Sequence, residues 1–413
     1  MKILDEVLKE IKPPKEEEQE IRSKIDEVLG KINSNIKDAR AVLGGSGAKG
    51  TWIRGIHDAD LFVLFDYEKY RESSKISDIL EKTLNKAFKN VARLHGSRDY
   101  FQIKKGRFTF EMIPILKIKK AEDAKNITDI SPLHAKWVNK YKELREEILL
   151  TKQFCKANGC YGAESYIKGF SGYICEILTI YYGSFTNLAK NATKWKDKVI
   201  VDVEGYYKKR NVLFELNRSK TYSPLIIIDP VQKDRNAAAA LSKEKFDIFK
   251  LKCKEFLKKP SKKLFEKKTI DVGKLGKKAK NKKLVLLDAA AKQGKEDVVG
   301  AKLLKALEHI KKELIFNGFT VLDYNWEWSK GKKALFYFIL DKKALSKIKV
   351  QTGPPLKAKS NVVLFRKKHK NVFVKNGRTY AKVNRKFTKA EELIGWLVKS
   401  DYIKSKVKSI RIR

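Results

Sequence analysis

Apolar residues recur along this chain with two periods, one of about 3.6 residues and one of two. Residues 1 to about 38 have the helical period, and Pro13-Pro14 separates two expected helices, because proline ends one helix and can begin the next. From 39 to about 120, short apolar runs lie between glycines, which predicts a small α/β unit. Its expected strands are 41–43, 61–65 and 108–115, and its expected helix is 77–92.

The pattern changes twice more toward the C-terminus. From about 134 to 258 the spacing is mostly helical, and the expected helices are 142–159, 173–189 and 242–257. The lysine-dense stretch 258–283 is predicted to be either a solvated linker or an RNA-contacting surface. After it an α/β pattern returns. The expected strands are 284–287, 319–328 and 334–340, followed by further basic strands, and the expected helices are 298–317 and 389–399.

The charge of the chain indicates the kind of partner. It has 92 Lys and Arg against 49 Asp and Glu, a formal net charge of +43, while 42% of its residues are hydrophobic. A folded protein this basic is expected to bind a polyanion, and nucleic acid is favoured. A membrane surface is disfavoured because the sequence shows no long apolar segment, signal peptide or basic amphipathic terminal helix.

The cysteines give an expectation about the compartment. They lack the CxxC spacing and the histidine partners of a zinc finger. We therefore expect reduced structural thiols in a cytoplasmic protein, in preference to a disulfide or a zinc site. The four residues are Cys155, Cys160, Cys175 and Cys253.

The stretch GGSGAKGTWIRGIHDADLFVLFD, residues 44–66, contains the first candidate site. Asp58 and Asp60 are two residues apart at the start of an expected strand, so both side chains lie on one face. Two such carboxylates repel each other unless a cation lies between them, and hard oxygen ligands suit Mg²⁺. A DxD pair alone is more often a solvated loop. Here a glycine-rich turn precedes it, with Ser46 and Lys49 placed to hold phosphate.

This combination of a Gly-Ser turn and a paired acid on a strand resembles the signature of the DNA polymerase β-like nucleotidyltransferase superfamily. It is not a Walker loop, because the GxxxxGK[ST] spacing is absent. The superfamily requires a third carboxylate on a neighbouring strand. Glu111 is the candidate, since it is a single acid in the alternating strand GRFTFEMIPIL and packing alone does not explain it.

Further segments make the resemblance narrower, to the archaeal-type, class I CCA-adding enzymes, which restore the 3′-terminal CCA of tRNA. The resemblance is dense from about 35 to 260 and weaker in the tail. The segments that carry it are SPLHAKW, LLTKQFCKANGCYGAES, GFSGYICEIL, YYGSF and IIIDPVQKDRNAAAALS, with NGFTVLDYNW and NGRTYAKVNRKFTKAEEL toward the end.

The resemblance implies an α+β multidomain fold. The implied parts are a polymerase β-like nucleotidyltransferase head at 1–133, a helical, nucleotide-binding neck at 134–258 and a basic α/β body and tail at 259–413. It also implies that Asp58, Asp60 and Glu111 are catalytic and bind two Mg²⁺ ions. The family usually has Glu then Asp in the pair and Asp as the third acid, so Mn²⁺ is an alternative metal.

The resemblance also assigns the nucleotide site. The triphosphate would be contacted by Ser46 and Lys49, together with Lys152 and Tyr161 from the neck. At the position of Lys49 the family usually has Arg. His134 matches the family's nucleotide-site histidine, and Arg235 would hydrogen-bond the incoming base. Taken singly, four of these residues have an ordinary alternative. Lys152 would be a surface lysine, Tyr161 a packing aromatic, His134 a helix cap and Arg235 the partner of a nearby acid.

The expected substrates are CTP, ATP and tRNA, and the tRNA would be held by its acceptor and TΨC stems. A homodimer is left open as the oligomeric state, and no membrane partner is expected. The proposed platform for the stems is basic and lies in the tail, and the alternative for each of its charges is an ordinary solvated side chain. It comprises 366–370, Arg378, Arg385, Lys386 and the terminal KSIRIR. The tail aromatics Trp326, Trp328, Phe336 and Tyr337 are expected in the core. The alternatives are a poly(A) polymerase or other terminal nucleotidyltransferase, and an inactive RNA-binding relative.

Overall fold

The computed structural model describes residues 2–55, 57–96, 98–208 and 210–413, and it divides into two compact units. The first is Met1–Lys268 and the second is Thr269–Arg413. Helices and strands are both abundant in each unit, so the prediction of a mixed α+β fold is confirmed. No described helix has the length and apolar character needed to cross a membrane.

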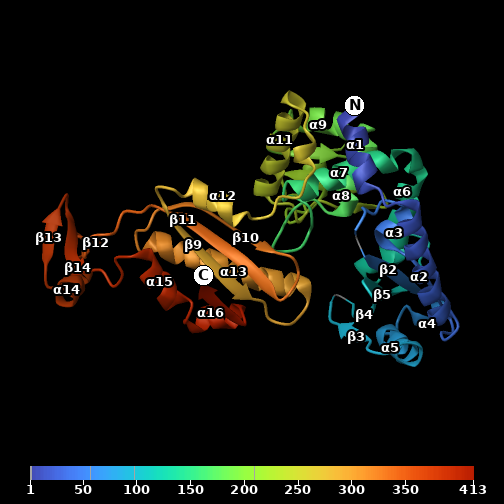
Figure 1. Ribbon diagram of the computed structural model, residues 1–413, viewed down its shortest axis with the longest axis horizontal. Helices are drawn as coiled ribbons and strands as arrows, with labels where there is room; N and C mark the ends of the chain where they lie inside the picture. Colours follow the sequence, from blue (N-terminus) through green and yellow to red (C-terminus); the bar gives the residue numbers. More distant parts are fainter. Residues whose placement is uncertain (1, 56, 97, 209) are drawn as a thin grey trace. The chain divides into compact units, whose positions relative to one another are not determined.

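A five-stranded sheet forms the N-terminal part of the first unit, in the order β1-β2-β5-β4-β3 (Figure 1). The pair β2–β5 is parallel and the other neighbours are antiparallel. Its strands are β1 (Ala39–Leu43), β2 (Asp58–Phe65), β3 (Ala92–Leu94), β4 (Tyr100–Lys105) and β5 (Phe108–Leu116). The helices of this part are α2 (Lys15–Asn33), α3 (Gly45–Lys49), α4 (Tyr67–Tyr70) and α5 (Ile76–Ala87).

The apolar face of α2 covers this sheet and closes its core. Ile21, Ile25, Val28 and Ile32 follow the helical spacing and are buried in one cluster with strand residues such as Leu61. Helix α5 adds to the same cluster. Because these helices cover the apolar residues of the sheet, the polar residues of β2 and β5 remain for the other face.

A second core holds most of the remaining helices of the first unit, while Val212 is buried in a smaller cluster with Ile226 and Ile228. Helix α1 belongs to the second core, since Leu4, Val7 and Ile11 are buried with residues of α7 and α8, so α1 is separated from α2 at Pro13-Pro14. The helices are α1 (Lys2–Ile11), α6 (Ser131–Val138), α7 (Arg145–Ala157), α8 (Gly172–Tyr182), α9 (Phe185–Ala192), α10 (Val212–Glu215) and α11 (Lys243–Lys258). The 3₁₀ turns are η1 (Ala121–Asp123), η2 (Ile127–Ile130), η3 (Asn139–Leu144) and η4 (Lys262–Leu264).

Two expectations for this region need correction. The single helix expected at 173–189 is wrong, because Gly183 adopts a φ of 78° and ends α8, and the Ser184 side chain caps the start of α9. A small sheet in the order β6-β7-β8 was also not expected. Its strands are β6 (Val199–Val201), β7 (Leu225–Asp229) and β8 (Gln232–Asn236).

The second unit has a four-stranded sheet in the order β10-β11-β9-β15, and α13 packs on it (Figure 1). A separate three-stranded sheet, β12-β14-β13, carries α14. The strands are β9 (Lys283–Ala290), β10 (Val321–Trp328), β11 (Lys333–Leu340), β12 (Ile348–Pro355), β13 (Val372–Lys375), β14 (Arg378–Asn384) and β15 (Ser409–Ile412). The helices are α12 (Val272–Lys278), α13 (Glu296–Phe316), α14 (Lys359–Lys368), α15 (Ala390–Leu397) and α16 (Asp401–Lys406).

Two expectations about buried residues are confirmed. Phe336 and Tyr337 are buried, and Trp326 and Trp328 pack partly buried against the core of the second unit. The four cysteines are free thiols and all are buried in the first unit. The lysine-dense stretch 258–283 spans the boundary between the units and includes α12, so part of it is regular structure.

Candidate active site

The three candidate acids lie on two neighbouring strands. In the parallel register of β2 and β5, Asp60 is directly opposite Glu111, and Asp58 precedes Asp60 on the same face. The residue between the aspartates, Ala59, points the other way and is buried. The structure therefore brings these acids to one face of the sheet, the face that α2 leaves open.

The carboxylate of Glu111 has a protein partner. Its Oε1 accepts a hydrogen bond of 2.6 Å from Nε2 of Gln102, which is its cross-strand neighbour on β4. Within the described residues, no group of three or more His, Cys, Asp or Glu side chains is arranged to hold a metal ion by itself. Magnesium sites commonly use only one or two carboxylates and complete their coordination with water and substrate phosphate.

The glycine-rich turn packs directly against Asp60. The Gly44 N–H donates to the Asp60 carbonyl at 2.7 Å, and a Cβ on Gly45 would lie 1.8 Å from Oδ2 of Asp60. Gly45 also has a φ of 52°, a conformation that favours glycine. Both observations explain why glycine begins α3 here.

The surroundings of Asp60 fit a divalent cation. Burial raises the pKa of Asp60, the nearby Asp58 carboxylate raises it further, and Lys49 opposes the rise. A cation beside the two aspartates would favour their charged forms, and oxygen atoms are the donors that Mg²⁺ and Mn²⁺ prefer. The donor set of this face therefore fits the metal ions expected from the sequence.

Lys49 and Lys152 are joined by a buried acid, Glu176 of α8. Nζ of Lys49 lies 2.7 Å from Oε2, and Nζ of Lys152 lies 2.7 Å from Oε1. The Thr51 hydroxyl donates to Oε1 at 3.0 Å and accepts from Lys152 at 2.8 Å. Glu176 is only 1% exposed, so two cations and a hydroxyl share one desolvated carboxylate. The two lysines predicted to bind triphosphate are thus brought together.

The pKa of Glu176 predicts a contribution to acid sensitivity. Burial alone would raise it, but Lys152 and Lys49 lower it to about 2 from an ordinary 4.5. Between these values the unfolded chain binds more protons than the folded one, so stability rises with pH. We expect this contribution to be complete above pH 4.5 and to be lost as pH falls toward 2.

This contribution can be measured by urea unfolding across that acidic range. The free energy of unfolding of the wild type should depend on pH more steeply than that of Glu176→Gln, which has no carboxyl group to titrate. Equal slopes for the two proteins would show that Glu176 is not held ionised by the lysines.

A second buried acid, Asp229 at the end of β7, contacts both His134 and Arg235. Its Oδ2 lies 3.0 Å from Nε2 of His134 and accepts a hydrogen bond from Nη1 of Arg235. Burial would raise the pKa of Asp229, but the His134 and Arg235 partners hold it below its ordinary value. The ordinary alternative for Arg235, an ion pair with a nearby acid, is therefore present in the structure.

Tyr173 lies between the two acid-centred clusters. Its hydroxyl donates to Oδ1 of Asp229 at 3.2 Å, and its ring centroid is 4.1 Å from that of His134. The Lys49 ammonium lies 5.1 Å from the same ring. The predicted triphosphate residues and the predicted base-contacting residue are consequently connected through one aromatic side chain.

The last two predicted residues occupy the edges of this arrangement. The Tyr161 hydroxyl and the Lys152 side chain both approach the α-carbon of Gly172, because a Cβ there would lie 3.0 Å from the hydroxyl and 3.5 Å from Lys152 Cε. Burial raises the pKa of Tyr161, so its hydroxyl remains a donor. Ser46 is the second residue of α3, one turn before Lys49.

Glu176, Asp229 and Tyr173 were not predicted as site residues. Glu176 had a usable signal, since it is a single acid in the apolar helix GYICEILTIYY, as Glu111 is in its strand. Asp229 is fully buried at the end of an apolar strand and had the same signal. Tyr173 had none, because a tyrosine in a helix is ordinarily a packing residue.

Three family models match successive parts of the chain. The description "Nucleotidyltransferase domain" matches residues 14–149, and "tRNA nucleotidyltransferase, second domain" matches 146–266. The description "CCA-adding enzyme, C-terminal domain" matches 280–407. Together they cover both compact units.

Curated relatives are similar over nearly the whole chain. The CCA-adding enzyme of Nanoarchaeum equitans is 35% identical over 382 residues, which are 91% of this chain and 92% of that protein. The CCA-adding enzyme of Sulfurisphaera tokodaii is 30% identical over 95% of this chain and 91% of its own length. A solved structure of Cid1, whose title describes RNA terminal uridylyl transferase activity, shares the fold with a TM-score of 0.52 and 17% identity. It covers 65% of this chain and 98% of that one.

Proposed function

Because this chain belongs to the family of the CCA-adding enzymes, we propose that it adds C, C and A in turn to the 3′ end of tRNA. The nucleotides come from CTP and ATP, and no nucleic-acid template is copied. Each addition joins the RNA 3′-oxygen to the α-phosphorus and releases pyrophosphate. The observation that carries this proposal for the present chain is the register that sets Asp60 opposite Glu111.

Asp58, Asp60 and Glu111 are the catalytic acids in this proposal. Two divalent cations held by them, Mg²⁺ or Mn²⁺, would supply Lewis-acid activation of the 3′-hydroxyl and would neutralise the pyrophosphate as it leaves. Gln102 orients the Glu111 carboxylate through its 2.6 Å hydrogen bond. The absence of a side chain at Gly45 lets α3 and its Ser46 approach the acids.

The triphosphate is held by Ser46, Lys49, Lys152 and Tyr161. Both lysines are fixed by Glu176 before the nucleotide arrives, which lowers the entropy lost when it binds. One carboxylate between two ammonium groups leaves one positive charge in excess, and the triphosphate carries the complementary negative charge. Tyr161 adds a protonated hydroxyl beside Lys152.

Arg235 reads the edge of the incoming base, with His134 beside it on Asp229. We expect Arg235→Ala to reduce discrimination between CTP and ATP at least about tenfold, with a smaller loss of rate. The reason is that Asp229 keeps His134 and Tyr173, so the fold of the site survives while the base-contacting donor is lost. Single-nucleotide incorporation into tRNA ending at each CCA position measures this.

A matched control is Lys233→Ala, which removes an exposed cation from the same strand, β8. It should leave nucleotide choice unchanged. Unaltered discrimination in Arg235→Ala would contradict its assignment to base recognition.

The reaction itself is tested by sequencing the products formed on tRNA that lacks its last three nucleotides. With both CTP and ATP we expect CCA and then termination. A homopolymer made from ATP alone would instead identify a poly(A) polymerase or related terminal transferase. This outcome has to be tested directly, because the likeness to Cid1 concerns the fold alone.

The remaining parts of the proposal concern tRNA and compartment. The head, helical neck and basic tail at 1–133, 134–258 and 259–413 would act on the substrate, with the tail holding the acceptor and TΨC stems. The formal net charge of +43 supports a large contribution from phosphate contacts. A cytoplasmic location is proposed with this function.

A further inference from the structure

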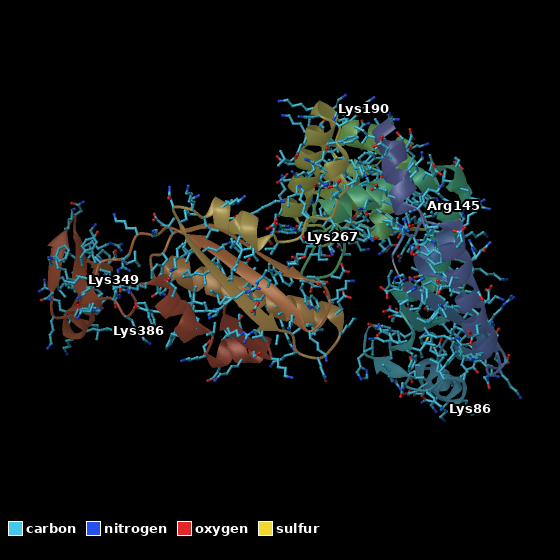
Figure 2. The ribbon with its side chains drawn as sticks, viewed as in Figure 1. Lys86, Arg145, Lys190, Lys267, Lys349 and Lys386 are labelled. Carbon is cyan, nitrogen blue, oxygen red and sulfur yellow. The ribbon has the colours of Figure 1, made fainter. Side chains whose placement is uncertain are left out.

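A cavity of about 350 Å³ lies in the second unit, where the sheet β12-β14-β13 adjoins the C-terminal end of α13. Figure 2 shows the labelled Lys349 and Lys386 on the side of that sheet facing the rest of the unit. The cavity lining includes Asn317, Lys349, Gln351, His369, Arg385 and Lys386. Neither family similarity nor the acids of the first unit assign it a role.

The lining has the composition of an anion site. Its charged members are the cations Lys349, Arg385 and Lys386, with a histidine among them, and no lining residue is acidic. The other polar members are amides, which also supply N–H donors. Within the described part of the chain, none of the three cations forms an ion pair. Three uncompensated cations around one cavity favour a negatively charged ligand.

Arg385 provides the observation that separates this cavity from an ordinary solvated lysine surface. Its Nη1 donates to the Asn317 carbonyl at 2.7 Å, at the end of α13, and the guanidinium packs beside Gly318. This bond fixes the guanidinium, while its Nε is buried and has no hydrogen-bond partner. A buried donor without an acceptor is costly, and a phosphate oxygen would satisfy it with a charge-assisted bond.

Two other basic side chains are held in place by aromatic rings. Nζ of Lys386 lies 4.2 Å from the ring centroid of Trp396, and the His369 ring lies 4.5 Å from that of Phe365. Such contacts restrict a flexible side chain and reduce the entropy that binding would cost. The cavity is therefore partly preorganised for its ligand.

We propose that this cavity binds one backbone phosphate of the RNA substrate. RNA is the occupant favoured over a free anion, because the chain belongs to a family acting on tRNA and its basic residues suit repeated phosphate contacts. The inference rests on the proposed function. It adds a defined site, centred on Arg385, to the general expectation of a basic tail. Since its lining comes from both the small sheet and the end of α13, the phosphate contacts both.

The test uses Lys349→Ala/Lys386→Ala, which lowers the charge of the cavity and leaves the Arg385–Asn317 bond intact. The control Lys399→Ala/Lys404→Ala removes the same charge from exposed residues of the same unit that lie outside both the cavity and the proposed platform. For tRNA lacking CCA, we expect the cavity variant to raise Kd about tenfold. Its slope of log Kd against log salt should fall by about one.

Phosphate-ethylation interference locates the contact on the RNA. At one tRNA phosphate, ethylation should weaken tRNA binding to the wild type and to the control. Ethylation of the same phosphate should not weaken tRNA binding to the cavity variant any further. Titration with inorganic phosphate is run beside it. If the cavity variant keeps every interference position, the proposal is overturned. The cavity variant could instead lose binding of inorganic phosphate while its tRNA affinity stays the same. That result would identify a free-anion site and would also overturn the proposal.

The failure of this proposal can be told apart from failure of the proposed function. Wild-type protein that adds C, C and A but shows no such phosphate leaves the function standing and removes the cavity proposal. Wild-type protein that adds no nucleotide contradicts the function, whatever the cavity binds. Thermal unfolding of both variants is measured first, to confirm that they are folded before the binding results are interpreted.

Discussion

Replacing Asp60 with Asn is expected to reduce nucleotide incorporation at least about a thousand-fold, equivalent to about 4 kcal/mol of transition-state stabilisation. Asn keeps the shape that fits against Gly45 but removes the negative charge opposite Glu111. Affinity for tRNA should change little, because it resides in many cationic contacts elsewhere. Single-turnover incorporation of CMP, with a parallel measurement of tRNA Kd, separates the two effects.

A matched control is Asp66→Asn, at the residue that directly follows the far end of the same strand. Asp66 caps α4 by accepting from the Lys69 N–H at 2.9 Å, and Asn caps helices equally well, so activity should persist. A large loss of tRNA affinity in Asp60→Asn would contradict the separation of binding from chemistry. Equal residual incorporation in Asp60→Asn and wild type would favour the inactive RNA-binding relative.

The second large effect is expected from Glu176→Gln. The change leaves Lys49 and Lys152 without their shared carboxylate in a buried site, which should lower the free energy of unfolding by about 3–5 kcal/mol. The KM for CTP should rise about tenfold, because neither ammonium is then fixed toward the triphosphate. The tRNA Kd should be unchanged. Urea unfolding and steady-state kinetics measure these quantities.

A triple variant distinguishes a structural role of Glu176 from a functional one. Replacing Glu176, Lys49 and Lys152 together with Leu, Met and Met removes all three charges, and such apolar replacements are often neutral for stability. We expect this variant to regain most of the stability that Glu176→Gln loses, but to have a still higher KM for CTP, because neither ammonium group is left to hold the triphosphate. Recovery of activity together with stability would show that the cluster serves only the fold.

The acids of β2 and β5 could be predicted because the evidence for them is local. The alternation of polar and apolar residues fixes the face of Asp58 and Asp60 within one strand, and Glu111 is conspicuous among apolar neighbours. Their catalytic role remains a prediction. The parallel pairing of β2 with β5 is not local, and only the structure shows that Asp60 and Glu111 are directly opposite.

The acid-centred clusters could not be derived from spacing. Glu176 is 127 residues from Lys49, and Asp229 is 95 residues from His134, so no sequence period relates them. The helix break at Gly183 was missed for another reason, because apolar residues continue on both sides of it with nearly the same spacing. A glycine inside such a pattern can either remain helical or end the helix.

The basic tail shows a further limit of sequence reasoning. Arg378 and Arg385 were expected as part of an RNA-binding platform, yet each also donates to a backbone carbonyl, of Gly353 and Asn317 respectively. Charge alone does not reveal such bonds. For Arg385 the bond leaves Nε buried without a partner, so an internal contact and an external ligand are compatible at the same side chain.

The position of Tyr173 has a consequence for fidelity. The ring contacts both the ammonium of Lys49 and the imidazole of His134, while its hydroxyl holds Asp229. A mismatched base that displaces this ring would disturb the binding of the phosphates as well as the recognition of the base. Discrimination should then show up as slower chemistry for the wrong nucleotide, and not only as weaker binding.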